Sequence, residues 1–370
     1  IWRPGHSRPG MTFRLIFLAQ LDSYTGLDAG AVAQTVARLL GIQPSGIERM
    51  AGGGNNKLFK ITGANGECFV AKQYFQQSTN PTSRLDAEFG GLEFLWRHGV
   101  TQIAEPLACD RDFGVAVYRY IDGSPAIDRM PEADDIGQAV AFLKRLQEMA
   151  RLPQAQDLPA AAEACFSLDE ILNNLRLRLN RLNKVEPKSP VFEELCALRD
   201  NEITPALEIM ADSARARSGR RPEAALDACW RTLSPSDFGF HNALRCSDGT
   251  LVFVDFEYFG WDDPAKTFAD FLLHPAMQLS RKHGKVFLSQ SLAAFNDPGL
   301  GERVRTYFPL FGLKWVFIIL NEFSPADWRR RVFSGHDEAK VETHLSGQLD
   351  KAKKFLNNAT RANEEFPYAA

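Results

Sequence analysis

The chain has 370 residues, of which 45% are hydrophobic and 24% charged, and its formal net charge is −3. These values are typical of a globular protein with ample material for a core, and they argue against a nucleic-acid partner. Its 6 cysteines are scattered and form no CxxC pair. This spacing favours reduced thiols in a cytoplasmic protein over a disulfide framework or a zinc site.

Residues 1–28 are predicted to be a disordered leader, and Met11 is a candidate start within it. The apolar run at residues 15–19 is broken by polar residues and has no clean cleavage site, so it does not predict a signal peptide. A second apolar stretch, residues 308–320, is too short and interrupted to span a bilayer and predicts a buried helix instead. No membrane association is therefore expected.

Residues 29–121 are predicted to form a small, β-rich lobe. Short apolar runs separated by Gly and Asn clusters are typical of an antiparallel meander, and Asn65-Gly66 is a strong hairpin signal. Apolar residues at helical spacing predict one helix before the meander and another after Pro81. The expected elements are a helix at 30–40, strands at 47–50, 58–61 and 68–73, a helix after Pro81, and a strand at 115–121.

Residues 122–370 are predicted to form a larger, mostly helical lobe. Apolar residues recur at helical spacing from about residue 131, and the tail after Asp337 has the pattern of an amphipathic helix. No internal repeat is present, which excludes a helical-repeat protein. The predicted fold class is α+β, with two lobes that meet near residue 121.

The segment Ser-Pro-Ser-Asp-Phe-Gly-Phe-His-Asn at residues 234–242 carries the clearest chemical signal. Asp237 and Asn242 have the Asp-x-x-x-x-Asn spacing of a kinase catalytic loop. Two apolar runs that flank the following Ser-Asp-Gly-Thr predict a hairpin. If this hairpin closes symmetrically, Asn242 faces Asp255, and their oxygens beside Asp237 form a site suited to Mg²⁺. Taken alone, an Asp before a strand is more often a cap or turn residue.

The front lobe contains the parts that a kinase needs to hold nucleotide phosphates. A glycine-rich cluster between two strands can bring backbone N–H groups close to phosphates. Lys72 lies in Phe-Val-Ala-Lys, similar to the kinase strand pattern Val-Ala-Ile-Lys, and Glu88 lies in the next helix, where the partner of the lysine is required. Each feature is common alone, but their order along the chain is that of a kinase. The cluster consists of Gly52, Gly53, Gly54 and Asn55.

With these parts in place, the chain resembles the aminoglycoside phosphotransferase family, which includes choline kinase-like and related small-molecule kinases of the protein-kinase-like fold. The resemblance covers residues 47–273. It is most specific over residues 234–273, where Val-Asp-Phe-Glu-Tyr-Phe-Gly-Trp-Asp-Asp-Pro-Ala (254–265) is similar to the family's metal-binding segment and the Gly-x-Asp-Pro-Ala that follows it. Phe-Glu in place of Phe-Gly after Asp255, and the absence of an Ala-Pro-Glu segment, argue against a protein kinase.

This resemblance implies an enzyme that uses ATP and Mg²⁺ to phosphorylate a hydroxyl of a small molecule. Asp237 would be the catalytic aspartate, and Asn242 and Asp255 would bind Mg²⁺. Glu88 would orient Lys72 against the phosphates. The residues expected to contact the nucleotide are Gly52, Gly53, Gly54, Asn55, Lys72, Glu88, and the hinge backbone at Arg119 and Ile121.

Three positions, in two places along the chain, depart from the family pattern. Pro235 and Ser236 stand where the family commonly has His-Gly, and Thr267 stands where an Asp often follows. These departures keep open a second hypothesis, a catalytically silent kinase-like module that binds nucleotide. His241 is expected to pack the loop rather than act as a base, because phosphoryl transfer through a loose transition state needs little proton abstraction. Asp263 is expected to cap a helix.

The acceptor stays open between an amino sugar, another sugar and an amino alcohol such as choline, bound in a cleft of the helical lobe. Glu322 and Asp327 could serve a cationic substrate, although solvated surface carboxylates are the favoured interpretation. Nothing in the sequence indicates an obligate protein partner.

Overall fold

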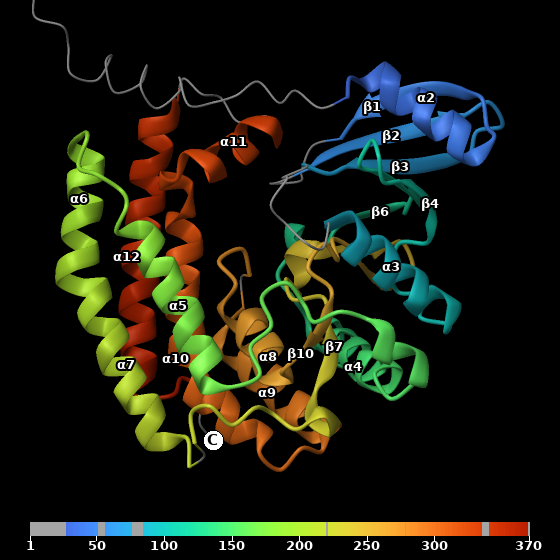
Figure 1. Ribbon diagram of the computed structural model, residues 1–370. Coiled ribbons are helices and arrows are strands. Elements are labelled where there is room, and N and C mark those ends of the chain that lie inside the picture. The colour runs from blue at the N-terminus through green and yellow to red at the C-terminus, as the bar shows by residue number, and fades with distance from the viewer. Residues whose placement is uncertain are drawn as a thin grey trace, which may run out of the picture.

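The computed structural model describes residues 27–50, 56–75, 84–219, 221–277, 279–334 and 340–368. A small antiparallel sheet packs beside a larger, mostly helical part, as Figure 1 shows. The predicted α+β class with a β-rich front and a helical back is confirmed by this arrangement.

The front sheet has five strands in the order β1-β2-β3-β5-β4, all paired antiparallel. Helix α2 covers the face turned away from the helical part, and α3 covers the other face (Figure 1). The side chain of Asp28 caps α2 by accepting from the backbone N–H of Ala31, and Val32 and Val36 are fully buried against the sheet. The elements are α2 (Ala29–Leu40), β1 (Pro44–Arg49), β2 (Lys57–Gly63), β3 (Cys68–Gln73), α3 (Arg84–Arg97), β4 (Pro106–Asp110) and β5 (Val115–Arg119).

Most predicted elements of the front lobe are present. The hairpin at Asn65-Gly66 joins β2 and β3, with Gly66 in the left-handed conformation at φ 86°. Strand β4 was missed, because it begins at a proline and all five residues are only half-buried. Strand β5 ends at Arg119, two residues earlier than predicted, and the division of the chain near residue 121 remains a prediction.

Nine helices build most of the described back part. The long helix α10 packs along α12 and α8, and it contains the predicted buried segment 308–320. The amphipathic tail predicted from the sequence is α12. No helix within the described ranges is long and apolar enough to cross a membrane. The helices are α4 (Ala133–Met149), α5 (Leu168–Leu182), α6 (Pro190–Leu198), α7 (Thr204–Arg217), α8 (Pro264–Leu273), α9 (Arg281–Phe295), α10 (Leu300–Leu320), α11 (Pro325–Ser334) and α12 (Val341–Glu364).

Two small sheets hold the loops that carry the chemistry. One has the order β6-β8-β9 and the other pairs β7 with β10. Beneath them the ring of Phe142 on α4 contacts those of Phe238, Phe253 and Phe256, at centroid distances of 5.8, 4.5 and 6.2 Å. This aromatic cluster fixes the loop after β7 and the segment after β9 against α4. The strands are β6 (Gly123–Pro125), β7 (Thr232–Ser234), β8 (Ala243–Cys246), β9 (Leu251–Phe253) and β10 (Gly260–Asp262).

The β8–β9 hairpin is present, but its predicted register is wrong by one residue. The N–H of Cys246 donates to the carbonyl of Thr250, so the turn has three residues rather than four. Gly249 occupies it with φ 88°, which a three-residue turn commonly needs. Asn242 therefore faces Val254 rather than Asp255.

Candidate active site

Lys72 on β3, Glu88 on α3 and Asp255 after β9 come together in one ion-pair cluster. The Nζ of Lys72 lies 2.6 Å from Oε2 of Glu88 and also donates to Oδ1 of Asp255. Lys72 and Glu88 are 6% and 3% exposed. Although burial lowers the pKa of Lys72, the carboxylates of Asp255 and Glu88 hold it above its usual value. The Lys72–Glu88 pair predicted from the sequence is present, and Asp255 joins it.

Further hydrogen bonds fix both oxygens of Glu88. The hydroxyl of Tyr74 donates to Oε2 at 2.6 Å, and the backbone N–H of Phe256 donates to Oε1 at 3.3 Å. Buried charges are tolerated when they are paired and hydrogen-bonded in this way. Glu88 thus ties α3 to both β3 and the segment after Asp255.

Helix α3 approaches that segment closely because Gly91 has no side chain. A Cβ at Gly91 would lie 2.3 Å from Cδ1 of Phe259, a buried ring. We expect Gly91→Ala to destabilise the protein by about 1–3 kcal/mol through overpacking, and to displace Glu88 from Lys72. Thermal unfolding measures the first effect. Gly90→Ala is the matched control, because nothing lies within 4 Å of its Cβ position, and it should not destabilise the protein. Equal stabilities for the two variants would contradict this packing argument.

Asp255 reaches the cluster through an unusual backbone conformation. Its φ is 67°, in the left-handed region that non-glycine residues rarely adopt. Burial raises the pKa of Asp255 to about 6 against the opposing effect of Lys72, and the nearby carboxylates of Glu257 and Glu88 add to the rise. A partly buried carboxylate with this shift is suited to a cation.

Glu257 is a site residue that sequence reasoning did not assign. It is 2% exposed, accepts from Nδ2 of Asn56 at 2.7 Å, and pairs with Arg84 at 3.3 Å. The only sequence signal was the Phe-Glu that replaces Phe-Gly after Asp255. Glu257 connects the start of β2, the start of α3 and the segment after β9.

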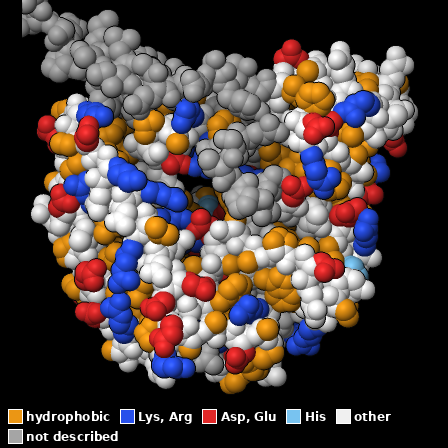
Figure 2. Space-filling view, in the orientation of Figure 1, with side chains coloured by type: hydrophobic (Ala, Val, Ile, Leu, Met, Phe, Trp, Pro, Cys, Tyr) orange, Lys and Arg blue, Asp and Glu red, His pale blue; other side chains and the backbone are white. Residues whose placement is uncertain are grey.

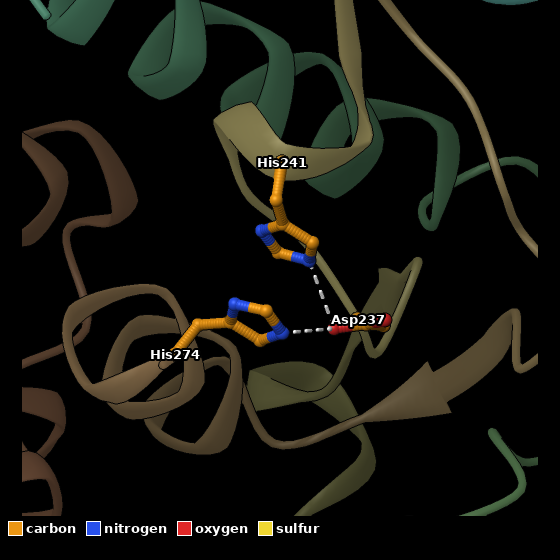
Figure 3. Close-up of side chains that lie close together, drawn as sticks. All are labelled: Asp237, His241 and His274. Carbon is orange, nitrogen blue, oxygen red and sulfur yellow. Dashed lines mark hydrogen bonds and ion pairs between the residues drawn. The ribbon is translucent and has the colours of Figure 1, made fainter. Parts of the chain in front are cut away.

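Asp237 follows β7, and two histidines converge on its carboxylate, as Figure 3 shows. The Nε2 atoms of His241 and His274 lie 3.1 and 3.4 Å from Oδ1 of Asp237. Nδ2 of Asn242 donates to the backbone carbonyl of Asp237 at 2.9 Å and lies 3.3 Å from Oδ2. Burial alone would raise the pKa of Asp237, but these partners, His241 first, hold it well below its usual value. Asp237 is therefore ionised at neutral pH.

The protonation of His274 follows from its other contact. Its Nδ1 accepts the backbone N–H of Ala276 at 3.2 Å, so a neutral ring must carry its proton on Nε2. Burial lowers the pKa of His274 to about 4, which keeps the ring neutral at pH 7. His274 thus places its Nε2–H close to the Asp237 carboxylate from the end of α8. No local pattern in the sequence predicts this contact.

His241, Asp237 and His274 lie close enough to suggest a metal site, but the rings exclude one. The two imidazoles stack with centroids 3.5 Å apart and an angle of 3° between their planes. A metal bound by both rings must lie in both ring planes, and two parallel stacked planes have no common point. The cluster instead orients the Asp237 carboxylate, in keeping with the predicted packing role of His241.

The two departures from the family pattern meet in one buried network. Ser236 has φ 69°, where the family commonly has glycine. Its backbone N–H donates to Oγ of Ser234, whose hydroxyl lies 2.8 Å from that of Thr267. Lys266 donates to the Ser236 hydroxyl at 3.0 Å. This network supports the loop before Asp237 without the usual histidine. The predicted cap is also present, since Asp263 accepts from Ala265 at the start of α8.

The donor set near Asp237 fits Mg²⁺. Because Nδ2 of Asn242 donates to Asp237, its amide oxygen is free to act as a metal ligand. Asp255 leaves one oxygen beyond the one that Lys72 holds, and its side chain is 34% exposed. Both residues and Asp237 line one cavity. Two hard oxygen donors of this kind suit a magnesium ion that also binds phosphates.

That cavity has a volume of about 850 Å³ and extends from Asp237 into the helical part. Figure 2 shows it as a hollow near the middle of this face, with basic side chains along one rim and acidic and histidine side chains inside. Asp327 contributes to its lining. Glu322 does not, and the surface interpretation of Glu322 is wrong, because it is 3% exposed and pairs with Arg331 at 2.5 Å.

The other predicted nucleotide contacts are the glycine-rich cluster and the hinge. Gly52, Gly53, Gly54 and Asn55 lie outside the described residues. At the predicted hinge, the N–H of Arg119 donates to Glu105. The N–H of Ile121 forms no hydrogen bond with a residue in the described ranges. The backbone of Ile121 therefore remains a candidate donor to adenine.

Comparison with known proteins agrees with this geometry. The model of the phosphotransferase enzyme family matches residues 46–305. A spectinomycin phosphotransferase in complex with ADP and spectinomycin has a TM-score of 0.62 at 10% identity, over 92% of this chain and 98% of that chain. A choline/ethanolamine kinase family protein from Mesorhizobium loti has a TM-score of 0.56 at 17% identity, over 96% and 99%.

Choline kinase LicA from Streptococcus pneumoniae is similar at a TM-score of 0.54 and 15% identity, over 89% of this chain and 98% of that chain. No curated protein matches the sequence. At these identities the solved structures establish the fold only, and their different acceptors do not decide which acceptor this chain uses.

Proposed function

This chain belongs to the phosphotransferase enzyme family, and from that premise we propose that it transfers the γ-phosphoryl group of ATP to a hydroxyl of a small molecule. The observation that carries the proposal is that Lys72, Glu88 and Asp255 form one ion-pair cluster from three separate segments, and that Asp255 lines the same cavity as Asp237. In the reaction the acceptor oxygen bonds to the γ-phosphorus, the bond to the β-phosphate oxygen breaks, and ADP leaves.

Asp237 orients the acceptor hydroxyl and takes its proton late in the transfer. Its depressed pKa makes it a weak base, which suffices because the loose transition state requires little proton abstraction. The hydrogen bond from His241 holds Oδ1 in place, with the neutral His274 ring packed beside it, so the carboxylate is aligned before the acceptor binds.

Lys72, aligned by Glu88, contacts the nucleotide phosphates, and Asn242 and Asp255 hold the magnesium ion. A bound Mg²⁺ neutralises charge that develops on the phosphates. The glycine-rich residues Gly52–Asn55 and the hinge backbone are proposed to complete the nucleotide site. Because the reaction draws on ATP, and because the described cysteines are all free, we assign the protein to the cytoplasm.

We expect Lys72→Met to lower kcat/KM for ATP by about 10²- to 10³-fold, because the phosphates lose a preorganised cation. ADP release with Mg²⁺ and a panel of sugars, amino sugars and amino alcohols provides the measurement. Lys354→Met on the exposed face of α12 is the matched control and should behave as wild type. A Lys72→Met protein that stays folded and retains full kcat/KM would refute the phosphate role of Lys72.

The replacement of the usual histidine by Pro235 keeps a second function in view, a silent module that binds ATP without turnover. Its expected signature is tight ATP binding by calorimetry with no ADP release for any acceptor. The network of Ser234, Ser236 and Thr267 weighs against it, since the loop is supported by other means.

A further inference from the structure

We propose that the acceptor of this enzyme carries an anionic group, a carboxylate or a phosphate, which binds a basic wall of the cavity. The inference rests on the proposed function for the acceptor's hydroxyl, but the anion preference itself can be measured by binding alone. The basic wall consists of Arg178 and Arg181 on α5, Lys314 on α10, and Arg330 and Arg331 on α11.

The basic wall lies on the acceptor side of the cavity. Asp237, Asn242 and Asp255 line the same cavity, so an acceptor hydroxyl at Asp237 can belong to a molecule that also contacts the wall. No described residue of strands β1–β5, where the adenine hinge is predicted, lines this cavity. A molecule at the wall therefore lies beyond the transferred phosphoryl group, away from adenine.

Three basic side chains of the wall can form further hydrogen bonds or ion pairs with a ligand. Lys314 is 6% exposed, and its nearest carboxylate, Asp270, lies 3.5 Å away and is already held by Lys266 at 3.1 Å. The Nε of Arg330 is buried and has no hydrogen-bond partner among the described residues. Arg181 is exposed and forms no ion pair with any residue in the described ranges. A buried, under-paired cation is costly unless a ligand completes it.

Two carboxylates near the wall, Glu163 and Asp327, are already paired with arginines of the wall, which disfavours a cationic acceptor. Glu163 accepts from Arg178 at 2.5 Å, and although burial raises the pKa of Glu163, Arg178 lowers it to about 2. Asp327 pairs with Arg330. An ammonium group entering the cavity would therefore meet under-paired cations before it met a free carboxylate.

A second cavity supports the same charge preference. It has a volume of about 360 Å³ and shares Arg178, Arg181, Asn321 and Asp327 with the first. Lys184 and Lys188 add two further cations, while Glu186 adds one carboxylate. Arg181 thus lies where the two cavities meet, and basic side chains outnumber carboxylates in the lining of the smaller cavity. An anionic group at this junction would contact several donors at once, as bidentate arginine recognition allows.

The test uses three hexoses that differ in charge: glucuronate, glucose and glucosamine. Binding to the full chain saturated with Mg²⁺ and a non-hydrolysable ATP analogue is measured by calorimetry, and ADP release is measured in parallel with ATP. Glucose 6-phosphate against glucose separates a phosphate from a carboxylate preference. We expect the better of the two anions to bind at least about tenfold more tightly than glucose, since one charge-assisted contact is enough for that ratio.

Arg181→Gln and Lys314→Met should each weaken binding of the anion about tenfold, while the affinity for ATP stays unchanged. Arg176→Gln is the matched control, because Arg176 lies on the same helix but does not line either cavity. Equal or tighter binding of glucosamine, no binding of any hexose, or an anion preference that survives both variants would each overturn the proposal. Weaker ATP binding in Arg181→Gln would also overturn it, by assigning the wall to the nucleotide.

The parallel ADP assay keeps the two proposals separate. An anion preference without ADP release supports anion binding by the basic wall and refutes the proposed transfer reaction. ADP release with glucosamine alone does the reverse, because it supports the transfer reaction and refutes the anionic acceptor.

Discussion

Replacing Asp237 with asparagine is expected to lower kcat by about 10³-fold while ATP binding stays close to that of wild type. The substitution keeps the size and most hydrogen bonds of the side chain but removes the charge that is proposed to align and deprotonate the acceptor hydroxyl. It leaves Lys72 and Asp255, the proposed phosphate and metal contacts, unchanged. A loss confined to kcat is the signature of an interaction made in the transition state.

The measurement combines ADP release under saturating acceptor with calorimetric binding of Mg·ATP. Asp212→Asn is the matched control, since the Asp212 side chain is 78% exposed on α7 and far from the catalytic loop in the chain. Residual activity above about a tenth of wild type would show that Asp237 is not the catalytic aspartate. A parallel loss of ATP binding would show instead that the substitution disturbs the nucleotide site.

Local patterns in the sequence predicted one contact of the candidate site correctly. Lys72 was recognised from its strand pattern and Glu88 from the helix that follows, and their ion pair is present at 2.6 Å. The pairing of Asn242 with Asp255 was wrong, because a three-residue turn shifts the register. The left-handed φ of Asp255, which brings it to Lys72, cannot be deduced from a hairpin pattern either.

Contacts between distant segments could not be predicted from the sequence, for a different reason. His274 is at the end of α8 and meets Asp237 only through the packing of that helix beside the catalytic loop. The basic wall likewise draws on three helices whose arginines and lysine look, one by one, like solvated surface residues. Within the fold, long amphipathic helices such as α12 were predicted, while the half-buried strand β4 was not.

Replacing the buried Lys266 is the second change for which the structure predicts a large effect. Lys266 is 0% exposed, and its Nζ lies 3.0 Å from Asp262, 3.1 Å from Asp270 and 3.0 Å from the hydroxyl of Ser236. Although burial raises the pKa of Asp262 to about 6, it remains ionised at neutral pH. Lys266 thus neutralises two buried carboxylates and holds the loop that precedes Asp237.

We expect Lys266→Met to destabilise the protein by about 3–5 kcal/mol, because it leaves both carboxylates buried without their cation. Chemical denaturation followed by fluorescence measures this loss, with Lys282→Met on the exposed start of α9 as the control. Adding Asp262→Asn to Lys266→Met should recover part of the stability, since it removes one unpaired charge. If the single variant loses less than about 1 kcal/mol, or if the double variant is less stable than the single, then the lysine acts mainly through packing and the carboxylates are neutral in the folded protein.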